Sequence, residues 1–244
     1  RGRWRRMSDP LSFPPLMSGE AVAGDALAAA CARAAEGCDA GLITYRLDGA
    51  EMQAALVFAP EVPLARAVAM LPLCGVGFQN ALGALSPPEV AVQLEWNGGI
   101  RVNGAACGAL RMMASTTDPA AVPDWLVVGF TLPLYPANDP DMAQTGLNPD
   151  QTALYAEGCA EVQPPALVES WARHTLHWIN RWEDLGPASL HGEWRGLAYG
   201  IDEEVTAQAA TGTFIGVDED FGMLLRAGET TRLIPLTTLL EPAP

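Results

Sequence analysis

The side chains that could do chemistry form an unusual set, because none of the 244 residues is a lysine. All 14 residues counted as lysine or arginine are arginines. No ε-amine is therefore present to form a Schiff base, act as a general base or hold a phosphate as a compact cation, and lysine-dependent catalysis is excluded. A lysine-poor, alanine-rich composition is also typical of a GC-rich genome, so we attribute the absence to codon bias.

The cysteines and histidines indicate neither a disulfide framework nor a metal site. The five cysteines are odd in number, scattered, and include no Cys-x-x-Cys pair, which is typical of reduced thiols in the cytoplasm. His174 and His177 lie three residues apart in a predicted helix, a spacing that some metal ligands have. No acidic pattern completes such a site, so we interpret both as packed or surface histidines and predict no metal.

The charge balance limits the partners. The formal net charge is −15, although four arginines stand in the first six residues. So acidic a surface repels phosphate groups, and we expect neither nucleic acid nor an anionic membrane as a partner. No stretch approaches the ~20 apolar residues of a membrane span, so we expect a soluble, cytoplasmic protein. Residues 1–7 precede an ordinary-looking N-terminus, and we interpret them as a non-native or disordered start.

Three segments predict helices. Residues 25–36 are alanine-rich, begin at a capping aspartate and are followed by a glycine. Residues 64–85 are helical in pattern, with a break or kink expected at their proline and at their paired glycines. In residues 164–186, aromatic and aliphatic side chains recur every three or four positions, which predicts a long amphipathic helix. Residues 8–24 predict an extended arm, and residues 135–151 a surface loop.

The sheet signals lie between these helices. Residues 41–46 and 52–58 predict two strands around an Asp-Gly turn, and residues 90–96 alternate as a half-buried strand does. The Asn-Gly dipeptide at 103–104 predicts a type I′ hairpin turn. Residues 125–130 are apolar throughout, and we expect them to form a central strand.

The last 50 or so residues have a different sequence pattern, in which short predicted strands follow one another between turn residues. These patterns cover residues 204–209, 213–217, 222–226 and 231–236. Such close spacing predicts a small barrel of the SH3 type. We therefore expect an α+β protein, with a mixed sheet flanked by helices over residues 8–193 and an SH3-like barrel over residues 194–244.

Three stretches together carry a family resemblance. Residues 95–110 combine a tryptophan-bearing strand, an Asn-Gly hairpin and a Gly-Ala-Leu return strand, residues 125–130 follow as a strand, and residues 214–226 form a second hairpin. In this order they resemble the biotin/lipoate protein ligase family, whose bacterial biotin ligases have a small C-terminal barrel. The resemblance implies the ligase-like fold. It also implies an activity that joins a carboxylic acid to ATP, with magnesium, and then acylates a lysine on a carrier-domain protein.

The chain departs from the family at the three places that do this chemistry. The family's basic Gly-Arg-Gly-Arg loop is replaced by a turn, residues 46–50, with one arginine. The Asn-Asp pair after the tryptophan is replaced by Gly98-Gly99, and the return-strand lysine by Ala105 or Ala106. Each loss removes charge stabilisation of a kind worth ~3–4 kcal/mol, or ~10²–10³ in rate. We therefore predict that standard ligation is badly impaired.

Three residues are weak candidates for replacement chemistry. Arg101 or Arg111 could supply the missing positive charge. Cys107 is the third, because some relatives carry acyl groups on a cysteine, although a small buried strand residue is the more economical interpretation of Cys107.

A protein can keep a ligand-binding groove after it has lost its catalytic activity. We predict a groove that suits a biotin-, lipoyl- or octanoyl-type acid. Its predicted ligand-binding residues are Tyr45, Arg46, Trp96, Asn97, Gly98, Gly99 and Gly108. Three functions stay open at this stage: a ligase or acyltransferase with altered chemistry, a non-catalytic binding protein for a small carboxylic acid, and a scaffold for a partner protein.

Overall fold

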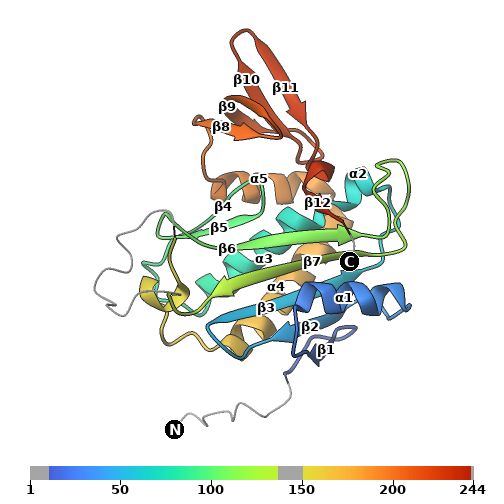
Figure 1. Ribbon diagram of the computed structural model, residues 1–244, viewed down its shortest axis with the longest axis vertical. Helices are drawn as coiled ribbons and strands as arrows, with labels where there is room; N and C mark the ends of the chain where they lie inside the picture. The colour runs from blue at the N-terminus through green and yellow to red at the C-terminus, as the bar shows by residue number, and fades with distance from the viewer. Residues whose placement is uncertain (1–10, 137–150, 243–244) are drawn as a thin grey trace.

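The computed structural model describes residues 11–136 and 151–242. They form a mixed eight-stranded sheet with helices on both faces and a separate four-stranded antiparallel sheet, as Figure 1 shows. The strands of the first sheet are, in spatial order, β1 (Ser18–Ala21), β2 (Leu42–Arg46), β3 (Glu51–Phe58), β7 (Leu126–Pro133), β6 (Ala105–Ala114), β5 (Gly99–Val102) and β4 (Val92–Leu94). The eighth, β12 (Leu240–Glu241), pairs with β6. The predicted α+β class, with a mixed sheet flanked by helices and a small all-β unit, is confirmed.

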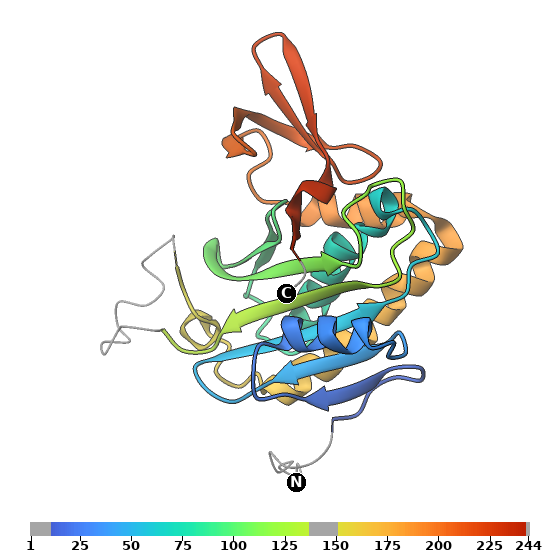
Figure 2. The ribbon, with the colours of Figure 1, turned by 45° about the vertical axis from the view of Figure 1, so that its right-hand side comes forward.

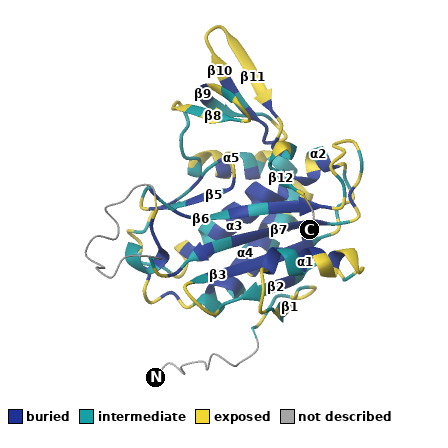
Figure 3. Ribbon diagram, in the orientation of Figure 1, coloured by how far each residue is buried: buried dark blue, intermediate teal, exposed yellow. Residues whose placement is uncertain are grey.

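Helices cover the two faces of this sheet unequally. The helices are α1 (Ala26–Ala35), α2 (Leu64–Ala67), α3 (Met70–Gly83), α4 (Pro164–Leu185) and α5 (Pro187–Leu197). Successive strand residues point to opposite faces, so Leu56 and Val128 pack in the large core with α3 and α4, whereas Ala55 and Val127 pack beneath α1. Figures 2 and 3 show α1 alone on its side, over a buried central sheet.

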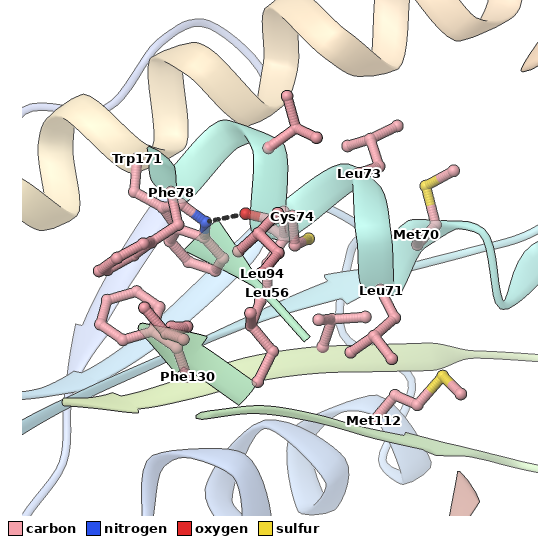
Figure 4. Packing of buried hydrophobic residues seen from close by; sticks show 14 of the residues in the cluster. Leu56, Met70, Leu71, Leu73, Cys74, Phe78, Leu94, Met112, Phe130 and Trp171 are labelled. Carbon is pink, nitrogen blue, oxygen red and sulfur yellow. Dashed lines mark hydrogen bonds between the residues drawn. The ribbon is translucent and has the colours of Figure 1, made fainter. Parts of the chain in front are cut away.

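The centre of the large core is aromatic, as Figure 4 shows. The rings of Phe78 on α3 and Trp171 on α4 both meet Phe130 of β7 edge to face, with centroids 5.2 and 5.0 Å away. The indole Nε1 of Trp171 donates to the Cys74 carbonyl oxygen at 3.1 Å. The predicted central strand is confirmed, because β7 is the fourth of seven strands along the sheet.

The predicted hairpin is also confirmed. Asn103 and Gly104 join β5 to β6 with φ values of 51° and 85°, the positive angles that a type I′ turn requires. The preceding strand is shorter than the alternation predicted, because β4 spans only Val92–Leu94. The chain turns there, with the Glu95 amide donating to the Gly99 carbonyl and the Gly98 amide to the Glu95 carbonyl.

The helix predicted over residues 64–85 is two helices, and its break lies elsewhere than expected. The chain leaves α2 at Val68 and begins α3 at Met70, and α3 then continues through Pro72 and both glycines. A proline in the first turn of a helix is tolerated because the first backbone N–H groups have no intrahelical acceptor. Gly77 serves the packing of α3 on α4, since a Cβ there would lie 2.5 Å from Thr175 Oγ1.

Two elements escaped prediction. The long helix α4 ends at Gly186 as expected, but Pro187 then begins α5, because a proline at the first helical position starts a helix as readily as it stops one. Part of the arm predicted over residues 8–24 is the edge strand β1, which runs parallel to β2. Residues 1–7 and most of the loop predicted at 135–151 lie outside the described residues.

The unit predicted to be a small SH3-like barrel is all-β and forms one four-stranded antiparallel sheet. It contains β8 (Glu204–Ala207), β9 (Ala210–Val217), β10 (Met223–Ala227) and β11 (Thr230–Ile234), paired in the order β11-β10-β9-β8. Trp96 links this unit to the core, because its indole Nε1 donates to the Phe221 carbonyl oxygen at 2.8 Å. After β11 a short 3-10 turn (Leu236–Leu239) returns the chain to the core sheet as β12.

Gly77→Ala should lower the free energy of unfolding by about 1–3 kcal/mol, because the new methyl group overpacks the contact between α3 and α4. Gly83→Ala, in the same helix, is the matched control, since its Cβ would meet only the flexible end of Gln79 at 3.9 Å. Urea unfolding followed by circular dichroism measures both. Equal stability of the two variants would contradict the close packing at Gly77.

Candidate functional site

Strand pairing places a row of side chains across the α1 face of the core sheet. Arg46 pairs with Gln53, Gln53 with Thr131, and Thr131 with Ala109. These four residues, the Arg46 row, lie on β2, β3, β7 and β6 beside the N-terminal end of α1. In the next row, Arg111 of β6 is aligned with Gly129 of β7.

Gln53 fixes the start of α1 against this row. Its Oε1 accepts the Ala26 backbone N–H at 3.0 Å, and its Nε2 donates to Glu51 Oε1 at 3.0 Å. Thr44 Oγ1 donates to the Ala26 carbonyl oxygen at 2.7 Å, so the first residue of the helix is held by two strands. Gln53 and Thr44 are both buried, which makes these hydrogen bonds costly to break.

Arg46 is the first of two cations on this face. Its Nη2 lies 2.6 Å from Glu51 Oε1, and its side chain is 23% exposed. Its Nε is buried and has no hydrogen-bond partner among the described residues. A buried donor without an acceptor is unfavourable, so Arg46 has an unused hydrogen-bonding position.

Arg111 is the second cation, and two carboxylates hold it. Its Nη2 lies 3.3 Å from Asp25 Oδ2, and its Nη1 lies 3.4 Å from Glu241 Oε2. Asp25 also caps α1, because its Oδ1 accepts the Ala28 N–H at 2.8 Å. With Glu51, this face therefore carries three carboxylates around two guanidinium groups.

The residues predicted to share one groove are distributed over the fold. Tyr45 and Arg46 are consecutive in β2 and point to opposite faces, so Tyr45 packs with the large core, 6.3 Å from the Phe13 ring. Trp96 lies in the turn between β4 and β5, and β3, β7 and β6 separate that turn from β2. Arg46 is thus the one predicted ligand-binding residue in the row beside α1.

Trp96, Gly98 and Gly99 instead line a small cavity between the core and the C-terminal unit. Trp194 and Phe221 complete its walls, and its volume is about 10 Å³. That is the space of about one water molecule, too little for a biotin-like acid.

The other two predicted residues have structural contacts. Asn97 Oδ1 accepts the Gly99 N–H at 3.1 Å and so closes the β4–β5 turn. At Gly108 a Cβ would lie 2.5 Å from the Thr131 carbonyl oxygen, so glycine allows β6 and β7 to pair closely there. Neither contact tests a role in ligand binding.

Arg101 is engaged in holding the chain together. Its guanidinium pairs with the Glu95 carboxylate and donates to the Gly104 carbonyl oxygen. Its Cζ also lies 4.0 Å from the Tyr199 ring centroid, a cation–π contact that joins the hairpin to the segment after α5.

Cys107 is buried, in agreement with the more economical interpretation. It is 1% exposed and faces the large core. Burial, assisted by the nearby Glu157 carboxylate, raises the pKa of its thiol to about 12. The reactive thiolate is therefore scarce at physiological pH, which argues against Cys107 as a nucleophile.

A larger cleft, of about 330 Å³, lies at the other end of α1. Trp125, Phe58 and Cys38 contribute to its walls, together with small residues and Asp124. The described residues that line it include a carboxylate and no arginine, so it suits an anion poorly.

The membership of the chain in a known family follows from comparison over most of its length. A family model described as the biotin/lipoate A/B protein ligase family matches residues 13–196. The chain belongs to this family. A second model, a domain of unknown function (DUF4444), matches residues 201–242. No match was found among curated proteins.

Solved structures agree with this membership. A biotin protein ligase-like protein of unknown function from Silicibacter sp. TM1040 is 62% identical, with a TM-score of 0.89 over 95% of this chain and 99% of that one. Biotin protein ligase from Aquifex aeolicus has the same fold at 13% identity, with a TM-score of 0.69 over 90% and 94% of the two chains. Its complex with biotin and ATP gives a TM-score of 0.66 at 14% identity, over 90% and 94% of the chains.

The three places at which the sequence was predicted to depart from the family are all within the described residues. The β2–β3 turn begins at Arg46, whose guanidinium pairs with Glu51. Gly98 has a φ of +93°, and a Cβ there would lie 2.3 Å from the Leu110 carbonyl oxygen, so this turn needs glycine. Ala105 and Ala106 begin β6 and have only methyl side chains.

Sequence reasoning missed the acidic side of the site. Gln53 and Glu51 did carry a signal, because they are polar residues in or beside an otherwise apolar strand pattern. Asp25 was predicted only as a helix cap. Glu241 carried no signal, since its contact with Arg111 spans 130 residues of sequence.

Among the described residues, no cluster of three or more His, Cys, Asp or Glu could hold a metal ion, and no helix is long and apolar enough to cross a membrane.

Cys107 should resist alkylation in the native protein, because its raised pKa keeps the thiol protonated far above neutral pH. Cys38, which is half-buried, should react first with iodoacetamide at pH 8. Peptide mass spectrometry before and after unfolding in urea measures both sites. Labelling of Cys107 as fast as Cys38 in the native protein would show an accessible, activated thiol instead.

Proposed function

We propose that this member of the biotin/lipoate ligase family binds a small carboxylic acid beside α1 and is impaired in, or altered from, ATP-dependent ligation to a carrier-domain lysine. The observation that supports the proposal is the state of the two arginines on that face. Arg46 and Arg111 are both paired with carboxylates, and the chain has no lysine to replace them.

The charge on this face argues against standard adenylation. Activating an acid with ATP brings the negative charge of a triphosphate next to the reacting carboxylate, and enzymes stabilise that charge with cations and backbone donors. Here Asp25, Glu51 and Glu241 already surround the two guanidinium groups. A solved structure of the Aquifex biotin protein ligase is a complex with biotin and ATP. ATP, with or without magnesium, does not fit the set of residues here, and we derive no step through it.

A single carboxylate fits better than a triphosphate. The unused Nε of Arg46 is a donor for a carboxylate oxygen, and a charge-assisted hydrogen bond of this kind orients an acid strongly. Ala109 of β6, on the same face, is half-buried and has only a methyl side chain. An apolar acyl tail, of the biotin, lipoyl or octanoyl type, would lie beside it.

A cytoplasmic location accords with the five cysteines, all of which are free thiols in the structure.

The alternative function is that of a non-catalytic scaffold, in which the fold presents a surface to a partner protein. The β10–β11 hairpin, which projects from the molecule and is exposed along β11, is the part of the structure that favours it (Figure 3).

Biotin, lipoate or octanoate should bind with a Kd near the micromolar range, on the order of −8 kcal/mol. Arg46→Ala should weaken binding at least about tenfold, because it removes a charge-assisted donor. Isothermal titration measures both, with Arg232→Ala, an exposed arginine on β11, as the matched control. If Arg46→Ala and the control bind the acid equally well, the ligand carboxylate does not bind at Arg46.

Adenylate formation should be no more than a trace. The protein lacks the cationic side chains that would stabilise the reaction, each worth ~10²–10³ in rate, even when ATP, magnesium and biotin are supplied. Pyrophosphate release measured against an active biotin ligase tests this. A burst of pyrophosphate equal to the enzyme concentration would show that the arginines have taken over the missing role.

A further inference from the structure

The C-terminal strand ends on the same face as the proposed acid site. Leu236 is buried after β11, and β12 then pairs in parallel with β6, with Leu240 opposite Met112 and Glu241 opposite Met113. Figures 1 and 2 show this segment returning from the small sheet to the core, close to α1. The chain therefore brings Glu241 to β6 from outside the core domain.

Glu241 and Asp25 form long ion pairs with Arg111. Their distances to its terminal nitrogens, 3.4 and 3.3 Å, are longer than the ~2.7–2.9 Å of strong charge-assisted hydrogen bonds. All three side chains are between 36% and 43% exposed, so water competes for each contact. Exposed pairs of this kind are weak and exchange readily.

A chain of contacts connects Arg111 to Arg46. Arg111 contacts Asp25, and the neighbouring Ala26 is hydrogen-bonded to Gln53, which shares Glu51 Oε1 with Arg46. Three strand spacings of ~4.8 Å separate β2 from β6, so the two arginines flank a strip of sheet roughly 15 Å wide. The side chains of Thr131 and Ala109 lie within this strip.

We propose that Arg111 is a second anion-binding position and that Glu241 is its displaceable internal counter-ion. The ligand class is an acid with an anionic group at each end, a dicarboxylate, that bridges Arg46 and Arg111. A ligand carboxylate that takes the place of Glu241 keeps the number of carboxylates in direct contact with the Arg111 guanidinium unchanged. The proposal rests on the proposed acid-binding function and adds a specificity determinant to it.

The test compares octanoate with octanedioate, two probes that differ by one terminal carboxylate, using isothermal titration. Glu241→Gln should bind octanedioate about fivefold more tightly than the parent protein, because a weak exposed pair no longer competes. Its octanoate affinity should stay unchanged. Glu36→Gln is the matched control, since Glu36 lies 3.4 Å from Arg33 and the net charge changes equally. Octanedioate binding that is no tighter in Glu241→Gln than in Glu36→Gln would overturn the proposal.

A ligand-free measurement separates the two hypotheses. Phenylglyoxal should modify Arg111 faster in Glu241→Gln than in the parent protein, and equal rates would refute the counter-ion role. Octanedioate binding without octanoate binding would count against the proposed monocarboxylate function and support the dicarboxylate class. Failure of octanedioate to bind either protein would overturn Arg111 as an anion position, whatever octanoate does.

Discussion

The register of β3, β7 and β6 controls the rest of this structure, because it decides which side chains face α1. A slip of one residue would exchange the two faces of a strand. Gly129 marks how closely these strands approach, since a Cβ there would lie 2.8 Å from the Ala55 Cβ. With this register, Leu56 and Val128 meet α3 and α4, while Gln53 and Arg111 lie beside the N-terminal end of α1.

The junction between the core and the small sheet depends on Trp96. Its indole donates a hydrogen bond to the Phe221 carbonyl oxygen, and its side chain is buried between the two units. The junction also sets where the chain leaves β11, and from there β12 reaches β6. The hydrogen bond between Trp96 and Phe221, which has a structural role, therefore helps to place the C-terminal strand β12 beside the proposed acid site.

Electrostatics separates this protein from a standard ligase more clearly than the fold does. Four arginines described above, Arg33, Arg46, Arg101 and Arg111, are each paired with at least one carboxylate. An excess of carboxylates offers little stabilisation to a phosphate, but it still allows one carboxylate to exchange for another. Under the proposed function, the same chain retains acid binding while adenylation is impaired.

The sequence by itself determined the local elements, because their signals are local. The Asn103-Gly104 turn, the caps of α1 and α4 and the all-β C-terminal unit each follow from a few adjacent residues. The absence of lysine also determined which chemistry is excluded. Only the tertiary structure decided that Tyr45 and Arg46 belong to different environments, that Trp96 lies far from both, and that Glu241 contacts Arg111. Those facts depend on strand order and on pairing between distant segments, which periodicity along a chain does not encode.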